Sequence, residues 1–529
     1  MTMRTHYIYI WILITAYVIN AQWSTDPNNN LVVAVGWDPH IVSDSAGGCY
    51  ITYNYGSFYP QKLAVERLDK YGYKPWGDKK QILGELPEQW QAQIIEDGEG
   101  GVIVSYDDNQ VVGTDFTSRV RVQKVDSAGN FLWGQTGVRV TTEETNHGQG
   151  GLVSDGDGGC VIVWQNYDER ILMNRIDRFG RRVWSETGIF LINTGTSIKV
   201  VRASDGNYYA QVNRNLYRIS QNGTIIRRDS VTLGYPVPDP EGGVILSGKV
   251  WNGMIPKLVA QRKDSLGNNL WQEPYVEIAD SLHINTMLSI IQYRGYYLYG
   301  WMGRKNGDNE ILQIQGIRHN GTLLFNEGSI SLSDNPGGTT HIPIIPSDSG
   351  SCLFISNYTN TFVGTFGQKI DTLGLLKWNS NQVLLSYPEL NYLNTTTDCA
   401  GGAIGVGYYN SDFGIRVFKV SSKGILGEII TVSESKSEEI VIGESFLFQN
   451  YPNPFNYSTI IKYQIPKEGQ VRILLYNILG EKLKILSDEY QYVGTYTLTF
   501  YSNDLSSGIY LYTLETGLKV LTKKLTIIK

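Results

Sequence analysis

The residues best placed by type and spacing to do chemistry are two carboxylates on a short glycine-rich stretch. Asp155 and Asp157 stand two positions apart in Asp-Gly-Asp-Gly-Gly, and several oxygen ligands on a tight loop are what a hard cation such as Ca²⁺ requires. The stretch lacks a downstream glutamate at the spacing of a calcium loop. Since Asp and Gly also favour turn geometry, we interpret it as a hairpin turn, with a calcium site as the alternative.

Other acid–base candidates are scattered rather than clustered in the sequence. The acidic ones, which follow the second strand of their units in a predicted rim loop, are Asp107, Asp108, Asp168 and Glu169. The histidines after residue 21 fall in different units and are His40, His147, His283, His319 and His341. There is no Gly-x-Ser-x-Gly, His-Glu-x-x-His or phosphate-binding motif, so we assign no catalytic, cofactor or metal residue.

These candidates belong to a chain that repeats. Its main landmark is Asp-x-x-Gly-x-x-x-Trp, and it begins at Asp69, Asp126, Asp177, Asp264 and Asp371. Three weaker copies lack both the Asp and the Trp but keep the glycine. The turn glycines of all copies are Gly72, Gly129, Gly180, Gly223, Gly267, Gly321, Gly374 and Gly424. An acidic glycine-rich turn precedes most of them. Units of roughly 40 to 55 residues that each form a four-stranded sheet are typical of β-propeller blades.

The pattern therefore resembles a β-propeller repeat protein and predicts an all-β fold over residues 22–432. We expect about eight four-stranded blades, with seven as the alternative if the degenerate fourth or a terminal unit fails to form one. The tryptophan is expected to pack between neighbouring blades. Leu31–Val35 resembles the last strand of a unit and can close the ring, although Ile429–Val432 competes for the same place.

Composition limits the classes of partner and of cross-link. With 41% hydrophobic and 18% charged residues the chain can bury a large core, and a net charge of −6 argues against nucleic acid as a partner. Cys49, Cys160 and Cys352 occupy the same position in different units, which argues against disulfides between them. We predict buried free thiols, with Cys352–Cys399 as the one pair to check.

The two ends of the chain carry sorting features. Residues 1–21 have a basic start, a short apolar stretch and a small residue before Gln22, which is typical of a secretory signal peptide. No later apolar run is long enough to predict a membrane-spanning segment. Residues 433–445 are polar and charged and are predicted to be a linker.

The final segment, residues 446–529, alternates β-branched or aromatic residues with polar ones and is punctuated by glycines, which predicts a small antiparallel sandwich of six or seven strands. It resembles the type A C-terminal sorting domain of the type IX (Por) secretion system. The positions that carry the resemblance are Tyr451, Pro452, Asn453, Pro454, Phe455, Asn456, Gly480, Gly508, Tyr510, Lys523 and Lys524. The resemblance implies binding to the type IX machinery and export through the periplasm and across the outer membrane, to the cell surface or the medium.

The propeller is then the exported cargo. We expect a binding or structural module for a glycan or a protein, and the alternative is an enzyme that acts on an extracellular polymer. Carboxylates, or a histidine with carboxylates, that converge at the axis of the ring would favour the enzyme, whereas aromatic side chains at the axis would favour binding.

Overall fold

The protein is described by a computed structural model that covers residues 23–427 and 446–528. Within these ranges the gaps are 57–59, 78–79, 83, 113–114, 144–146, 196–197, 253–254, 272–274, 280–288, 294, 305–309, 326–327, 333–341, 359–362, 379–381, 448–449, 451–452, 454, 457, 466–468, 479, 492–493, 503–504 and 518–519. The predicted signal peptide and linker lie outside the described residues. The chain divides into two compact units, residues 1–430 and 431–529.

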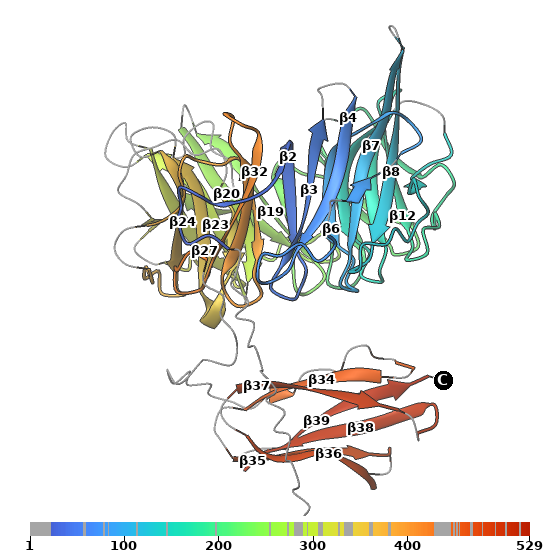
Figure 1. Cartoon of the computed structure of the whole chain (residues 1–529), viewed down its shortest axis with the longest axis vertical. Coiled ribbons are helices and arrows are strands. Elements are labelled where there is room, and N and C mark those ends of the chain that lie inside the picture. The colour runs from blue at the N-terminus through green and yellow to red at the C-terminus, as the bar shows by residue number, and fades with distance from the viewer. Residues whose placement is uncertain are drawn as a thin grey trace, which may run out of the picture. The chain divides into compact units, whose positions relative to one another are not determined.

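The first unit is a ring of four-stranded antiparallel blades (Figure 1). Blade 1 consists of β2 (Trp37–Ser43), β3 (Cys49–Gly56), β4 (Gln61–Leu68) and β5 (Lys80–Ile82). Blade 2 consists of β6 (Glu88–Glu96), β7 (Val102–Val112), β8 (Asp115–Val125) and β9 (Val138–Arg139). Blade 3 consists of β10 (His147–Ser154), β11 (Cys160–Asn166), β12 (Arg170–Ile176) and β13 (Ile189–Asn193). Blade 4 consists of β14 (Ile198–Arg202), β15 (Tyr208–Val212), β16 (Asn215–Ile219) and β17 (Ile225–Ser230).

The second half of the ring repeats this plan. Blade 5 consists of β18 (Gly234–Pro238), β19 (Val244–Asn252), β20 (Ile255–Lys263) and β21 (Val276–Ala279). Blade 6 consists of β22 (Ser289–Tyr293), β23 (Tyr296–Arg304), β24 (Glu310–Arg318) and β25 (Ile330–Ser331). Blade 7 consists of β26 (Ile344–Pro346), a 3-10 turn η1 (Asp348–Gly350), β27 (Cys352–Tyr358), β28 (Gly364–Ile370) and β29 (Val383–Ser386). Blade 8 consists of β30 (Asn391–Thr397), β31 (Ala403–Tyr408), β32 (Gly414–Val420) and, as its outer strand, β1 (Leu31–Val35).

The ring has eight blades, so the larger of the two predicted numbers is confirmed, and the degenerate fourth unit forms a complete blade. The first strands of successive blades contact one another around the ring, and β30 contacts β2. These strands therefore surround the axis. The tryptophan after the Asp-x-x-Gly turn lies before the short fourth strand, as Trp133 does before β9.

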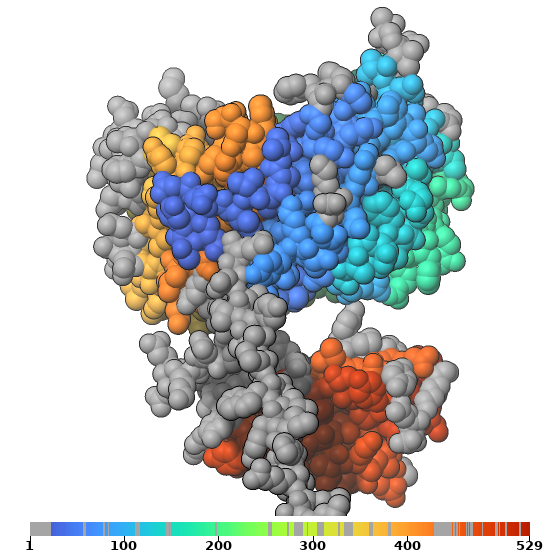
Figure 2. Space-filling model, in the orientation of Figure 1, coloured from blue at the N-terminus to red at the C-terminus, as the bar shows by residue number. Residues whose placement is uncertain are grey.

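The N-terminal segment closes the ring, and we call residues 23–35 the clasp. β1 pairs antiparallel with β32, and in Figure 2 the dark blue N-terminal residues lie against the yellow and orange residues of the last blades. The amide of Tyr387 donates to Pro27 O at 2.9 Å, and Lys74 Nζ donates to Val33 O at 2.7 Å. The clasp thus joins blades 7, 8 and 1, as the sequence predicted for Leu31–Val35. The competing residues 429–432 lie outside the described part of the chain.

Neighbouring blades are joined by a repeated contact, which we call the latch. In each latch, the tryptophan of one blade donates a hydrogen bond from its indole Nε1 to the turn of the next blade. The acceptor is the carbonyl of the second residue of the Asp-x-x-Gly turn or of its weaker copy, and Trp76 donates to Ser127 O at 2.9 Å. The turn glycine has a positive φ, and a Cβ there would lie about 3 Å from the indole, as at Gly129. The further pairs are Trp133–Gly180, Trp184–Gly223, Trp271–Gly321 and Trp378–Gly424. Glycine is therefore required twice, by the turn conformation and by the ring that covers it.

The degenerate units replace the tryptophan without losing the contact. In blade 4 the Arg227 guanidinium covers Gly267 and donates to Ser265 O at 3.1 Å. In blade 6 the Phe325 ring covers Gly374. In blade 8 the ring comes from the clasp, because Trp23 lies on Gly72 and donates to Lys70 O at 2.8 Å.

The second unit is a small sandwich of two antiparallel sheets. One sheet has the order β33 (Phe446–Leu447), β34 (Ser458–Ile465) and β37 (Gly494–Tyr501). The other has the order β36 (Lys482–Gln491), β35 (Gly469–Tyr476), β38 (Gly508–Glu515) and β39 (Val520–Ile527). Alternate residues of both sheets form one buried core, which includes Ile461, Tyr463, Ile473, Leu475, Tyr512 and Leu514. The all-β fold with a terminal sandwich is therefore confirmed.

All four cysteines are free, and three of them are buried. Cys49, Cys160 and Cys352 each begin the second strand of a blade, where burial raises the thiol pKa, to about 12 for Cys352. Cys399 differs because it is exposed, in the acidic turn of blade 8.

Since the thiolate is the reactive form, we expect a thiol reagent to modify Cys399 in the folded protein and to leave the other three unmodified. The Cys399→Ser variant should then not react until denaturant is added. Mass spectrometry after alkylation locates the label. Rapid labelling of Cys160 under native conditions would contradict the buried position given to the first residue of these strands.

Candidate ligand-binding surface at the closing seam

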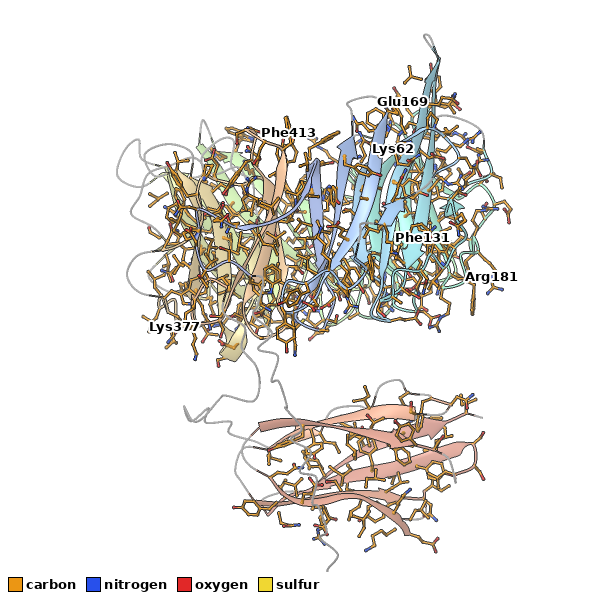
Figure 3. The ribbon with its side chains drawn as sticks, viewed as in Figure 1. Lys62, Phe131, Glu169, Arg181, Lys377 and Phe413 are labelled. Atoms are coloured by element: carbon orange, nitrogen blue, oxygen red, sulfur yellow. The ribbon has the colours of Figure 1, made fainter. Side chains whose placement is uncertain are left out.

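The blades present two different faces. The Asp-x-x-Gly turns and the acidic turns lie on one face, the turn face, because both connect to the same ends of the antiparallel strands. The hairpins between second and third strands, and the beginnings of the first strands, lie on the other, the hairpin face. Figure 3 shows Phe413, Lys62 and Glu169 at the hairpin face and Arg181 and Lys377 at the opposite one.

Three aromatic rings are stacked on the hairpin face of blade 8, and we call Tyr392, Tyr408 and Phe413 the seam platform. The Tyr392 and Tyr408 centroids are 5.7 Å apart with an interplanar angle of 23°, and those of Tyr408 and Phe413 are 6.0 Å apart at 16°. The central ring is buried, whereas Tyr392 is 65% and Phe413 41% exposed. The two outer rings are therefore accessible to a ligand.

The platform adjoins the start of blade 1, where a histidine and a carboxylate meet. The Gly36 amide donates to Phe413 O at 2.7 Å, and the imidazole of His40 lies 3.6 Å from Asp38 Oδ1. Burial raises the pKa of Tyr408, with smaller contributions from Tyr392 and Asp38. Aromatic faces, a carboxylate and an imidazole thus share one surface at the seam between the first and last blades.

The positively charged side chain at this surface, Arg416, is paired with neighbouring residues of the protein. Arg416 Nη1 donates to Asp412 Oδ1 at 2.9 Å, and its guanidinium carbon lies 3.9 Å from the centre of the Tyr409 ring. Hydrogen bonds from Arg416 lower the pKa of Asp412 to about 2. Asp412 is therefore ionised at neutral pH, and Arg416 has little free charge to offer an anionic ligand.

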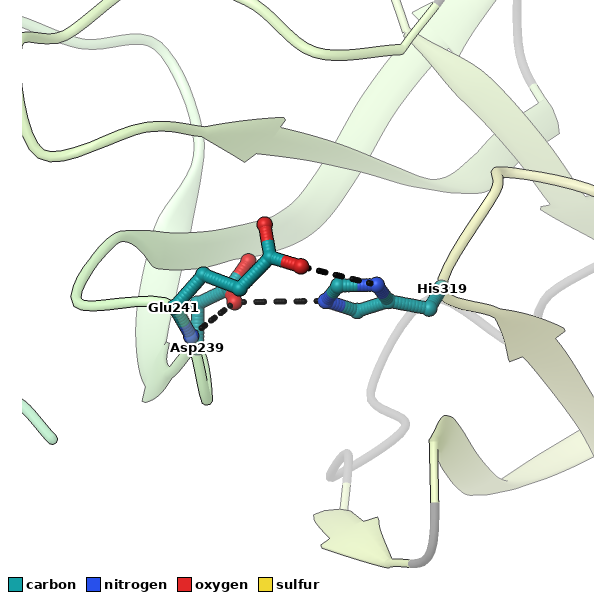
Figure 4. A group of neighbouring side chains, drawn as sticks. All are labelled: Asp239, Glu241 and His319. Carbon is teal, nitrogen blue, oxygen red and sulfur yellow. Dashed lines mark hydrogen bonds and ion pairs between the residues drawn. The ribbon is translucent and has the colours of Figure 1, made fainter.

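A second group with ligand chemistry lies on the turn face between blades 5 and 6 (Figure 4). One atom each from Asp239, Glu241 and His319 lie within 4.8 Å of one another. His319 Nε2 is 3.3 Å from Asp239 Oδ1, and its Nδ1 is 3.8 Å from Glu241 Oε1. Among the described residues, this is the one group whose geometry could hold a metal ion.

An arginine binds both carboxylates of this group. Arg262 forms an ion pair with Asp239, and its Nη2 donates to Glu241 Oε2 at 2.7 Å. Burial alone would raise the pKa of Asp239, but the hydrogen bonds from Arg262, the Glu241 amide and His319 outweigh it and lower that pKa. The same bridge between the acidic turn and the third strand occurs in six other blades, as Asp44–Arg67, Asp97–Lys124, Asp155–Arg175, Asp205–Arg218, Asp348–Lys369 and Asp398–Lys419. The group is therefore part of the repeated blade structure.

The candidate calcium residues belong to this repeated structure as well. Asp155 Oδ1 accepts the amides of Asp157 and Gly159 at 2.8 Å each, and its Oδ2 accepts Arg175 Nε at 2.9 Å. Asp157 is exposed and lies 3.9 Å from Arg175 Nη2. Both oxygens of Asp155 thus bind donors of the protein, as a hairpin turn requires.

Two predicted rim acids are not in a loop. Asp107 and Asp108 lie within β7 and are buried, and Asp108 accepts the amides of Glu85 at 2.9 Å and Leu86 at 3.1 Å. The hairpin of blade 2 is longer than expected, so these residues remain inside the strand. Asp168 lies in the turn after β11, as predicted. His147 begins β10, and His283 and His341 lie outside the described residues.

The opening motif of the C-terminal unit is tied to its last strand. Asn453 Oδ1 accepts the Thr526 amide at 2.8 Å, and Asn453 Nδ2 donates to Lys524 O at 3.2 Å. The Phe455 amide donates to Thr526 O at 3.0 Å, and the Phe455 ring is buried. The motif thus joins the beginning of the unit to its end, over about 70 residues of sequence.

The remaining motif residues are distributed over the unit. Gly480 has a φ of +82° in the turn that follows Asn477, and Gly508 begins β38. The Tyr510 hydroxyl donates to Ser506 O at 3.0 Å. Lys523 and Lys524 are exposed on β39. Tyr451, Pro452 and Pro454 lie outside the described residues.

Comparison with known families identifies this unit. Residues 449–529 match the family described as a secretion system C-terminal sorting domain. The C-terminal unit is a type IX sorting domain. The sorting domain implies that the chain binds the secretion machinery and is exported across the outer membrane, to the cell surface or the medium. It does not identify the activity of the propeller that precedes it.

Solved structures that match this chain are distant in sequence. A Dyadobacter fermentans protein of unknown function is 8% identical over 74% of this chain and 97% of its own, with a TM-score of 0.34. Chaetomium thermophilum Sqt1 is 12% identical over 75% and 97%, with a TM-score of 0.39. A Bacteroides thetaiotaomicron endo-arabinase is 11% identical over 64% and 94%, with a TM-score of 0.25. At these TM-scores the likenesses carry no functional argument.

No curated protein matches the sequence. Within the described part of the chain, no helix has the length and apolar character needed to cross a bilayer. The seam platform was not predicted from the sequence, because its rings come from two strands and from the hairpin that follows the second of them. Only the abundance of tyrosine, 35 residues, hinted at exposed aromatic surfaces.

Proposed function

We propose that the exported propeller is a binding module that holds an extracellular glycan at the seam platform. The observation that carries the proposal is the stack of Tyr392, Tyr408 and Phe413, whose outer rings face solvent. A sugar ring presents polarised C–H groups on its face, and these are attracted to the negative face of an aromatic ring. Asp38 and His40 lie beside the stack and can accept or donate hydrogen bonds to hydroxyl groups.

The second candidate is hydrolysis of the glycan, and the Asp38–His40 pair favours it. Most glycosidases use two carboxyl groups, one of which must carry a proton to the leaving group. Asp412 cannot serve as that acid at neutral pH, since its pKa is about 2. We therefore favour binding without cleavage.

The test replaces an outer ring without disturbing the backbone. Tyr392 has a φ of +53°, and asparagine is well tolerated in this conformation, so Tyr392→Asn removes the ring and keeps the fold. We expect the wild-type chain to bind at least one of arabinan, mixed-linkage β-glucan, galactomannan and starch in isothermal titration calorimetry. Tyr392→Asn should weaken that binding about tenfold or more, which is the usual effect of losing an aromatic anchor.

Phe179→Ala is the matched control, because Phe179 is an equally exposed ring on the turn face, and its affinity should equal that of the wild type. Equal binding by Tyr392→Asn and the wild type would overturn the seam platform as the site. Release of reducing ends from the bound polysaccharide, abolished by Asp38→Asn, would establish the hydrolytic alternative instead.

A further inference from the structure

The same β-bulge occurs in the first strand of four blades. In each, two residues stand opposite one residue of the second strand, and the first of the two is not glycine but has a left-handed backbone. These first residues are Asp38 (φ 52°), Gln91 (φ 51°), Tyr235 (φ 54°) and Tyr392 (φ 53°). A left-handed conformation is unfavourable for an L-residue other than glycine, so the fold sustains this strain in the first strands of four blades, at equivalent positions in blades 1, 2 and 8.

Blade construction does not demand the bulge. The first strand of blade 4 pairs with the second from Ile198 to Arg202 without a shift, and that of blade 6 does so from Ser289 to Tyr293. In blade 3 the irregularity falls at Gly150, whose φ is not positive. Bulges with strained non-glycine residues are devices that re-aim a side chain, and they gather at functional sites.

The four bulges lie on the first strands, which surround the axis. In blades 1, 2 and 8 the bulge stands opposite the fifth residue of the second strand, and in blade 5 it stands opposite the third, so Tyr235 lies two residues closer to the turn face. Blades 8, 1 and 2 are neighbours, and blade 5 lies opposite blade 1 in a ring of eight. Tyr235 is 47% exposed, Tyr392 is 65% exposed, and Gln91 is exposed as well. We call these four residues the axial mouth.

The chemistry of the axial mouth suits a polyhydroxylated ligand. It offers two phenol rings for stacking, one amide that both donates and accepts, and one carboxylate that accepts hydrogen bonds. Asp38 is its single charged side chain, and the nearby Arg416 is held by Asp412. An anionic sugar would meet a carboxylate without a free cation among the described residues of the seam, whereas a neutral sugar meets no such repulsion.

We propose that the axial mouth extends the seam platform into one site that takes a neutral glycan chain of several sugars, with Tyr235 as its far contact. The inference rests on the proposed function, since Tyr392 belongs to both. A single sugar can cover Tyr392 and its neighbours in blades 8 and 1. A chain that crosses the mouth also reaches blade 5, so its affinity exceeds that of a short fragment through the added contact.

The experiment measures affinity against chain length. The probes are the neutral polysaccharide that binds the wild-type chain in the panel above, and its di- to hexasaccharide fragments. We expect affinity to rise with length and then to level off. Tyr235→Asn, which keeps the left-handed backbone, should weaken binding of the polymer about tenfold and leave the disaccharide unchanged, whereas Tyr392→Asn should weaken both.

Three results would overturn the inference, and they are distinguishable from failure of the proposed function. One is a Tyr235→Asn variant that binds every length as the wild type does. Another is an affinity independent of length while Tyr392→Asn still loses binding, which would leave the proposed function intact. The third is equal or tighter binding of polygalacturonate or alginate. If the wild-type chain binds no glycan at all, both proposals fall.

Discussion

Deleting the clasp, residues 23–35, should lower the free energy of unfolding of the propeller more than any internal change of similar size. Without it, blade 8 loses its outer strand and β32 becomes an open edge. The latch at Gly72 loses Trp23, a ring that is 4% exposed. The hydrogen bonds from Tyr387 to Pro27 and from Lys74 to Val33 are lost at the same time. The deletion therefore removes every contact through which the clasp joins blades 7, 8 and 1.

Single substitutions separate packing from strand pairing. We expect Trp23→Ala to cost about 3–5 kcal/mol, as for other buried tryptophans, and Trp23→Phe to cost less, since it loses the hydrogen bond to Lys70 but keeps a ring. Thr25→Ala, at an exposed position two residues away, is the matched control. Denaturant unfolding followed by tryptophan fluorescence measures the differences. A deletion variant as stable as the wild type would show that the ring is closed by other means.

The blades could be predicted from the sequence because each repeated residue of the motif meets a local structural requirement. Gly129 must adopt a positive φ and must also lie under Trp76, so both residues recur in register and the repeat is visible in one chain. The closing strand was predictable for the same reason, since Leu31–Val35 has the pattern of a fourth strand. Trp23 was not predicted to complete blade 8. It lies before β1, near the N-terminus, whereas the turn of blade 8 ends at Gly424, at the other end of the propeller sequence.

The candidate site could not be predicted from the sequence in the same way. The axial bulges recur in structure but not in residue type, since Asp38, Gln91 and Tyr235 share only their backbone conformation. Stacking of Tyr392 on Tyr408 depends on the register between β30 and β31. Burial of Asp108 depends on how far β7 extends before its hairpin. Such properties arise from tertiary pairing, which a single sequence does not report.

Deleting Phe448 to Lys529 should retain the protein in the periplasm of a host with a type IX secretion system. The sorting domain folds around its own core, so its removal takes away the export signal without taking any strand from the propeller. Fractionation of cells and medium, with immunodetection of the propeller, measures the result. We expect the extracellular fraction to fall to background while the periplasmic protein keeps its native unfolding temperature.

Point variants test whether the fold of the sorting domain or its exposed residues are required. Phe455→Ala removes a buried ring at the junction of the opening motif with β39, and should cost about 3–5 kcal/mol and reduce export together with stability. Lys523→Ala with Lys524→Ala removes exposed charges, which changes stability little. A loss of export by this double variant, with unfolding unchanged, would therefore report recognition by the machinery. Continued appearance of the truncated chain outside the cell would show instead that the propeller carries its own export signal.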